Sequence, residues 1–270
     1  MERKILITGA TGTVARAAAS YLKENRYHVI GISRSIEKGD EDYSETHQID
    51  LLDEEDLKAM KKILEDVHGV FHLAWNLSVE NFDTGEKWPQ NIEMFRNILE
   101  ASVESDVPVF INGSSIHAGT ADIAAYTVEA SLEDTPEPYR SSIDPETDYD
   151  MRKQDPGMLL SPLEDNPDSP YGESKVETED ILQNSVRDGQ FRLGVSIRIG
   201  GVNSEDEQQM DGEPYYPSLY WSHKDLGKTI ALILAADLNE KKGYHQFYGV
   251  SDNEGRIFSI ENNFTGENKE

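Results

Sequence analysis

The sequence predicts an α/β fold, with a doubly wound parallel β-sheet followed by a small C-terminal portion. Three observations support this prediction. Short apolar runs recur along the chain, as buried parallel strands do. Helical patterns separate these runs, and strands that alternate with helices form parallel sheets with right-handed crossovers. A glycine-rich turn joins the first apolar run to the first helical pattern.

The expected elements follow from these patterns. The strands, of which the third is the weakest, are expected at Lys4–Thr8, His28–Ile32, His47–Ile49, Val70–Leu73, Val107–Ile111, Leu193–Ile199 and Gln246–Val250. The helices are expected at Val14–Lys23, Glu54–Leu64, Ile92–Val103, Val176–Val186 and Leu226–Ala236. The alternation stops between about Thr120 and Pro170, where acids and prolines are frequent. We expect a loop or short helices there, beside the active site.

The composition is strongly acidic. Asp and Glu total 52 against 25 Lys and Arg, which gives a formal net charge of -27. The acids are spread along the whole chain, and such a surface repels nucleic acids and anionic membranes. Concentrated salt screens this self-repulsion, so the composition favours a protein from a halophile. The alternative is an ordinary acidic cytosolic protein.

Other compositional features narrow the class of protein. The chain has no cysteine, which excludes disulfides and thiolate chemistry. Its apolar runs are too short to span a membrane, and a strand expected almost at the N-terminus leaves no room for a signal peptide. We therefore expect a cytoplasmic protein. No group of His, Asp and Glu has metal-ligand spacing, so we expect no metal.

The glycine-rich turn predicts a dinucleotide site. It reads Gly9-Ala-Thr-Gly12-Thr-Val-Ala15 and lies between a strand and a helix. Its glycines let the backbone approach a pyrophosphate, and the N-terminus of the following helix attracts the phosphates. The contacts expected here come from Gly9, Thr11, Gly12, Thr13 and Val14. The alternative is a tight turn without a ligand.

The end of the second strand indicates which cofactor is bound. An acid there bonds the ribose of NAD, whereas an arginine accommodates the 2′-phosphate of NADP. This chain has Ser33, Arg34 and Ser35, and a guanidinium can bind phosphate through two hydrogen bonds. We therefore predict NADP, with NAD as the less favoured cofactor. The alternative is that Arg34 points into solvent.

Further cofactor contacts are expected at the ends of the later strands. Asp50 and Leu51 follow the third strand, where adenine contacts are expected, although Asp50 is equally explained as a solvated acid. The remaining candidates end the fourth and sixth strands and are Leu73, Ala74, Trp75 and Ile199.

A second group of residues predicts acid–base chemistry. Tyr171 and Lys175 are four residues apart, which places both on one face of a helix. A nearby ammonium and the charge of a nicotinamide favour the phenolate and lower the pKa of the tyrosine, so that it exchanges a proton with a substrate hydroxyl. Ser115 follows the fifth strand and can hold the reacting oxygen. Asn91 either completes a water-linked proton path to Lys175 or caps the helix expected at Ile92–Val103.

These motifs resemble the extended short-chain dehydrogenase/reductase family, also called the NAD-dependent epimerase/dehydratase family. GATGTVA, HLAW, NIEMFRNILEA, SSIHAG, YGESK and RIGG occur in the family's order and cover nearly the whole chain. The resemblance implies a Rossmann fold in one domain over 1–270, in which 1–200 mainly bind NADP and 201–270 supply the substrate side and last strand. It also implies a homodimer or homotetramer. Tyr171 and Lys175 are expected to contact the cofactor as well.

Within that family, the chain is most similar to sugar 1-dehydrogenases. These are the uronate dehydrogenases and the haloarchaeal aldose dehydrogenases, such as L-arabinose dehydrogenase. The segments that carry this similarity are Ser78–Glu80, Ser115 with His117, Arg198–Gly200, Ser222–Asp225 and Gly249–Asn253.

The similarity implies roles for individual residues. Tyr171 is the base, Lys175 modulates it, and Ser115 is the hydroxyl partner. Ser78, Ile116 and His117 face the sugar, and the product is an aldonolactone. His223 is a weaker candidate for substrate contact than His117, and the alternative for both is a polar residue that lines the cleft or packs locally.

Two departures from the relatives bear on the substrate. Relatives carry Asn at the position of Ile116, and uronate dehydrogenases bind the substrate carboxylate with an Arg, whereas this chain has none between Arg198 and Arg256. An unpaired carboxylate or phosphate in a cleft is costly, so we expect a neutral aldose. L-Arabinose comes first, and D-galactose, D-xylose and D-glucose remain open.

Three alternative functions remain. The first is a uronate or glucose-6-phosphate dehydrogenase. The second is a nucleotide-sugar epimerase or dehydratase, against which the short stretch after Ile199 counts. The third is a non-enzymatic NADP-sensing regulator, against which the Tyr171 and Lys175 pair counts.

Overall fold

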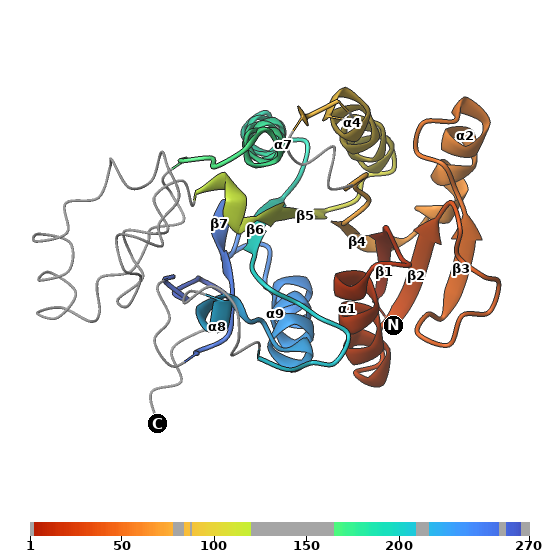
Figure 1. The fold of residues 1–270 in the computed structure, drawn as a ribbon. Helices are drawn as coiled ribbons and strands as arrows, with labels where there is room; N and C mark the ends of the chain where they lie inside the picture. Colours follow the sequence, from red (N-terminus) through yellow and green to blue (C-terminus); the bar gives the residue numbers. More distant parts are fainter. Residues whose placement is uncertain are drawn as a thin grey trace, which may run out of the picture.

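The chain forms one parallel sheet (Figure 1). The computed structural model describes residues 3–77, 84–86, 88–119, 165–208, 216–253 and 258–265. The strands lie in the order β3-β2-β1-β4-β5-β6-β7, and all neighbouring strands are parallel. Their bounds are β1 Lys4–Thr8, β2 His28–Ser33, β3 Glu45–Gln48, β4 Val67–His72, β5 Val109–Ser115, β6 Leu193–Ile199 and β7 Gly243–Gly249. The predicted doubly wound α/β fold is therefore confirmed.

Helices cover both faces of this sheet. Figure 1 shows α1 and α9 on one face, and α2, α4 and α7 on the other. Their bounds are α1 Thr13–Glu24, α2 Glu54–Ile63, α4 Trp88–Glu104, α7 Pro170–Arg187 and α9 His223–Ala235. The short helix η1 Ile116–Ala118 follows β5, and the short helix α8 Tyr216–Leu219 precedes α9. None of the helices in the described residues is long and apolar enough to cross a membrane.

The core has two layers because successive strand residues point to opposite faces. Ile5 and Ile7 of β1 pack with α1 and α9, whereas Leu6 packs with α2, α4 and α7. All three side chains are fully buried. Apolar runs without alternation are expected when helices cover both faces of a sheet, and this is why the strands were readable from the sequence.

Several helices begin earlier than the sequence predicts. The structure begins α4 at Trp88 and α7 at Pro170, whereas the apolar patterns begin at Ile92 and Val176. The first turn of α7 is fixed by its cap, because the Ser169 hydroxyl accepts a hydrogen bond from the backbone N–H of Gly172. Proline at the first helical position extends the helix toward its N-terminus. The loop expected between Thr120 and Pro170 lies mostly outside the described residues.

The strand order places one crevice at the carboxyl ends of the strands. The chain builds β1, β2 and β3 in one direction and then returns to add β4 on the other side of β1. Loops that follow β1 and β4 therefore diverge, and ligands bind at such switch points in open α/β sheets.

Candidate active site at the carboxyl edge of the sheet

The turn after β1 is tied closely to the end of β4. Gly9 has φ +65, and a Cβ on it would lie 2.8 Å from the backbone nitrogen of Ala74. The hydroxyl of Thr8 accepts hydrogen bonds of 2.9 Å from the backbone N–H groups of Leu73 and Ala74. Only glycine suits this conformation and this close approach. The backbone beside the crevice is therefore bare.

The N-terminus of α1 presents unused backbone donors to this crevice. Gly12 is the cap residue, and no side chain accepts a hydrogen bond there. The predicted contacts Thr13 and Val14 form the first turn, whose N–H groups have no partner within a helix. Such groups attract anions, and a bare turn beside them leaves space for a phosphate. The residues present therefore fit the pyrophosphate of a dinucleotide.

The crevice gathers most of the predicted cofactor residues. Those that line it are Gly9, Thr11, Gly12, Ser33, Arg34, Ser35, Asp50, Leu51, Leu73, Ala74 and Trp75. Asp50 is engaged as well, because its carboxylate accepts a hydrogen bond of 3.0 Å from the backbone N–H of Leu52. The sequence reasoning missed other lining residues, which are Thr8, Ile32, Ile49, Asn76 and Met94. Most of them end or follow strands, and this position is the signal that identifies them.

Arg16 and Arg34 differ in their partners. Arg16 on α1 is held by Asp40 at 2.8 Å and by Asp42 at 2.5 Å. These carboxylates raise the pKa of Arg16 above its usual value and neutralise its charge. Arg34 is exposed, lines the crevice, and forms no ion pair with any residue that the structure describes. Its guanidinium is therefore available to an anionic ligand.

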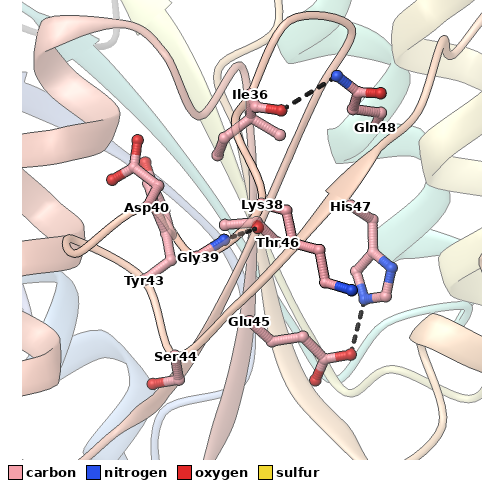
Figure 2. A pocket seen from close by; sticks show the side chains of 10 residues that line it. All are labelled: Ile36, Lys38, Gly39, Asp40, Tyr43, Ser44, Glu45, Thr46, His47 and Gln48. Atoms are coloured by element: carbon pink, nitrogen blue, oxygen red, sulfur yellow. Dashed lines mark hydrogen bonds and ion pairs between the residues drawn. The ribbon is translucent and has the colours of Figure 1, made fainter.

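A larger hollow beside β3 lies apart from these residues (Figure 2). Ten residues from 36 to 48 line it, and some of its polar groups bond one another. Figure 2 shows the amide of Gln48 donating to the carbonyl of Ile36, and His47 next to the carboxylate of Glu45. None of the predicted site residues lies there, so we assign the chemistry to the crevice at the strand ends.

The predicted catalytic residues come together at the end of β5. Ser115 ends this strand, in register with the predicted cofactor contact Ile199 at the end of β6. The hydroxyl of Ser115 hydrogen-bonds the phenol of Tyr171, which lies in the first turn of α7. The ammonium of Lys175 lies one turn further along and donates a hydrogen bond of 2.9 Å to the carbonyl of Gly113.

Burial controls the charges of this pair. Burial raises the pKa of Tyr171 to about 12, and the charge of Asp168 adds to the rise, while the Ser115 hydrogen bond opposes it. The prediction that a neighbouring ammonium lowers this pKa is therefore not met in the protein alone. The same burial lowers the pKa of Lys175 to about 7, because the interior disfavours its charged form.

A buried ion pair anchors α7 to β6. Arg198 has no exposed surface, and its guanidinium donates to the two carboxylate oxygens of Glu179 at 3.1 and 2.8 Å. It also contacts Asp165, just before α7, and the hydroxyl of Ser114 donates to Glu179. Glu179 lies one turn beyond Lys175, so this network fixes the position of that helical face.

His117 lies against Tyr171 and is held by a carboxylate. Its Nδ1 is 2.6 Å from an oxygen of Asp168, and the hydroxyl of Ser169 donates to the other oxygen at 2.7 Å. The rings of His117 and Tyr171 are 5.6 Å apart at an angle of 66°. The predicted substrate residue His117 is thus beside the candidate base. The structure adds Asp168, which no sequence pattern singles out among 52 acids.

Other predictions are changed by the structure. Asn91 lies inside α4 and does not cap it. Its side-chain amide accepts a hydrogen bond from the backbone N–H of Asn76 at 2.8 Å and donates one to the carbonyl of Asn76 at 3.3 Å. Ile116 is buried with Tyr248, Val250 and Phe258, so this packing does not support its predicted position against a sugar.

The two remaining candidates have different outcomes. His223 bonds the carbonyl of Asn203 at 2.7 Å, which supports its local role. Ser78 lies outside the described residues. Among the described residues, no three His, Asp or Glu side chains gather as metal ligands.

The sheet order and the glycine turn at its switch point define a Rossmann-like α/β protein. Residues 5–214 match the family described as the NAD dependent epimerase/dehydratase family, and the chain belongs to it. The sequence has no significant match among curated proteins.

Several solved structures share the fold. Uronate dehydrogenase from Agrobacterium tumefaciens is 20% identical with a TM-score of 0.67, over 96% of this chain and 80% of that chain. Glucuronic acid dehydrogenase from Chromohalobacter salexigens is 20% identical with a TM-score of 0.67, over 96% of this chain and 80% of that chain. UDP-N-acetylglucosamine 4-epimerase from Bacillus cereus is 20% identical with a TM-score of 0.62, over 93% of this chain and 79% of that chain.

Proposed function

We propose that the chain is an NADP-preferring aldose 1-dehydrogenase, which oxidises C1 of a neutral aldose to the aldonolactone. The carrying observation is that Ser115, Tyr171 and Lys175 meet at the end of β5, beside a crevice that fits a dinucleotide. L-Arabinose is the first candidate substrate, followed by D-galactose, D-xylose and D-glucose. The Tyr171 and Lys175 pair counts against a regulator without catalysis.

The residues of this chain handle the proton of the reaction. The hydroxyl of Ser115 hydrogen-bonds the substrate hydroxyl at C1, and Tyr171 accepts the proton of that hydroxyl at its phenolic oxygen. When bound, the nicotinamide supplies the acceptor for the hydride that leaves C1. Loss of one hydride and one proton converts the cyclic aldose into the lactone. Positive charge next to the phenol favours the phenolate, which burial otherwise disfavours.

Cofactor preference depends on Arg34. A 2′-phosphate at the end of β2 would pair with its guanidinium, and Ser33 and Ser35 would supply hydroxyls beside it. The first turn of α1 and the bare turn at Gly9 would hold the pyrophosphate. Because Arg16 is already neutralised by two carboxylates, Arg34 is the cation expected to distinguish NADP from NAD.

Preference for a neutral sugar follows from the charges around the base. Asp168 lies close enough to raise the pKa of Tyr171, and it would repel an anionic substrate. Arg198 is fully buried and bound to Glu179 and Asp165, so it cannot pair with a carboxylate or a phosphate. A uronate dehydrogenase is the second candidate because solved structures of that activity share the fold.

A panel of sugars tests this proposal. Neutral aldoses, uronates and glucose 6-phosphate are incubated with NADP or NAD in molar salt, and reduction of the cofactor is followed by absorbance. We expect turnover with neutral pentoses or hexoses, and faster turnover with NADP. Turnover only with uronates would refute the charge argument. Cofactor binding without turnover on any sugar would favour the regulator.

A further inference from the structure

Lys175 is a buried lysine that lacks an ion pair. It is 4% exposed, and its ammonium donates to the carbonyl of Gly113. The nearest carboxylate along its helix belongs to Glu179, whose two oxygens are both bonded to Arg198. No ion pair of Lys175 occurs within the described parts of the chain. Burial lowers the pKa of Lys175 to about 7, so another group is needed to stabilise its charged form near neutral pH.

The indole of Trp75 is that group. The ammonium nitrogen of Lys175 lies 3.5 Å from the centroid of the Trp75 ring. The face of an aromatic ring carries negative potential, tryptophan gives the strongest attraction, and the attraction is greatest where water is excluded. The same indole meets Tyr171 edge to face, with ring centroids 6.3 Å apart. Trp75 also lines the crevice, so it lies between that crevice and both catalytic side chains.

We propose that Trp75 is a positioning residue that holds Lys175 as an ammonium ion against Tyr171. This inference rests on the proposed function, because Lys175 matters only if Tyr171 transfers a proton. It extends that function by making the charge of the lysine depend on a residue in the loop after β4. The loop is itself fixed by the hydroxyl of Thr8 through Ala74, so the indole is attached to a rigid base.

The other ionisable groups around Lys175 do not replace the indole. His72 on β4 is neutral, because burial and then the charge of Lys175 lower its pKa to about 3. In the protein without cofactor, Tyr171 on the same helix is a neutral phenol, since its pKa is raised to about 12. Glu179 does raise the pKa of Lys175, but Arg198 on β6 offsets most of its charge.

A titration of Lys175 tests the proposal without requiring turnover. The full-length protein is labelled with ¹³C at the lysine Cε, and its chemical shift is followed with pH in molar salt, with Lys175→Met identifying the signal. Replacing the indole by Trp75→Leu should lower the pKa of Lys175 by about one pH unit. Trp75→Phe keeps an aromatic face and should give a smaller decrease. Leu77→Ala, at an exposed residue of the same loop, should give none.

Kinetics provide the second readout. With NADP and the best aldose, Trp75→Leu should lower kcat about tenfold and leave KM for the sugar within about twofold. Trp75→Phe should recover most of kcat. An unchanged Lys175 pKa in a folded Trp75→Leu protein would overturn the proposal. An equal loss of kcat in Trp75→Leu and Trp75→Phe would overturn it as well. If no sugar is turned over but the Lys175 pKa decreases, the indole has the proposed effect and the proposed function is wrong.

Discussion

The two halves of the candidate site are built in different ways. Backbone atoms form the part of the crevice that fits a pyrophosphate, through the bare turn at Gly9 and the uncapped first turn of α1. Buried ionisable side chains form the candidate catalytic corner, where Lys175, Glu179 and Arg198 lie within the core. The pyrophosphate part depends on a few consecutive residues. The corner depends on elements that are distant in the sequence.

This difference determines what each half tolerates. A backbone site fails when a Cβ is added, and it is insensitive to pH because N–H and carbonyl groups do not titrate. A corner of buried charges fails when one partner is removed, because the remaining charge is left without compensation in a medium of low dielectric. Its stability also varies with pH, since folding shifts the pKa of Lys175 from 10.5 to about 7.

The largest expected effect concerns Lys175. Below pH 7 its ammonium is charged in both the folded and the unfolded states, so burial lowers the free energy of unfolding. Between pH 7 and 10.5 the folded lysine is neutral while the unfolded lysine binds a proton, so this cost decreases as pH rises. Lys175→Met lacks this cost. Its free energy of unfolding relative to wild type should therefore be roughly 4 to 5 kcal/mol more favourable at pH 7 than at pH 10.5. Denaturant unfolding across this range measures it, and a constant difference would contradict the assigned pKa.

The buried ion pair gives the next effect. Arg198→Met leaves Glu179 buried without its guanidinium and should destabilise the protein by about 3 to 5 kcal/mol. Adding Glu179→Leu removes the unpaired charge and should restore most of that loss. Chemical denaturation of both variants tests this. If the double variant is as unstable as the single one, packing rather than charge holds α7 against β6.

Much of the fold was predictable because buried parallel strands leave a local record. Lys4–Thr8 and Leu193–Ile199 have the bounds read from the sequence. The helix ends were not predictable to the same degree. The apolar pattern reports only the buried face, whereas the starts at Trp88 and Pro170 depend on polar first turns.

The site shows the same division. The glycine turn and the Tyr171 and Lys175 pair could be found because each motif is short. The buried pair of Glu179 and Arg198 and the indole of Trp75 over Lys175 join segments far apart in the chain. The rise in the pKa of Tyr171 was missed for a related reason, since burial is a property of the assembled fold.

Alanine substitutions at two glycines with positive φ separate backbone strain from the close approach of neighbouring backbone atoms. Gly9→Ala forces an alanine to φ +65 and places its Cβ 2.8 Å from backbone atoms, which should cost about 2 to 3 kcal/mol of stability. Gly189→Ala is the matched control, because Gly189 has φ +79 and a Cβ added there would meet nothing within 4 Å. It should cost only about 1 kcal/mol. Thermal unfolding compares them, and equal losses would show that the close approach to Leu73 and Ala74 after β4 has no effect.

The smallest effect concerns cofactor choice. Arg34→Ala should raise the Kd of NADP about tenfold to thirtyfold and that of NAD less than about twofold, because only NADP carries the 2′-phosphate. Arg16→Gln is the control and should leave the ratio of the two affinities unchanged, since Arg16 is already paired. Calorimetric titration in molar salt measures both. Equal weakening of both cofactors by Arg34→Ala would exclude Arg34 as the 2′-phosphate contact.

Tyr171→Phe tests the central claim most directly, because it removes one oxygen atom and keeps the ring between Trp75 and His117. Oxidation of the best aldose and binding of NADP are measured on the same preparation. The account predicts that turnover falls about a thousandfold or more while the Kd of NADP changes less than about twofold. Turnover that survives in Tyr171→Phe would contradict it, because another group would then be taking the proton.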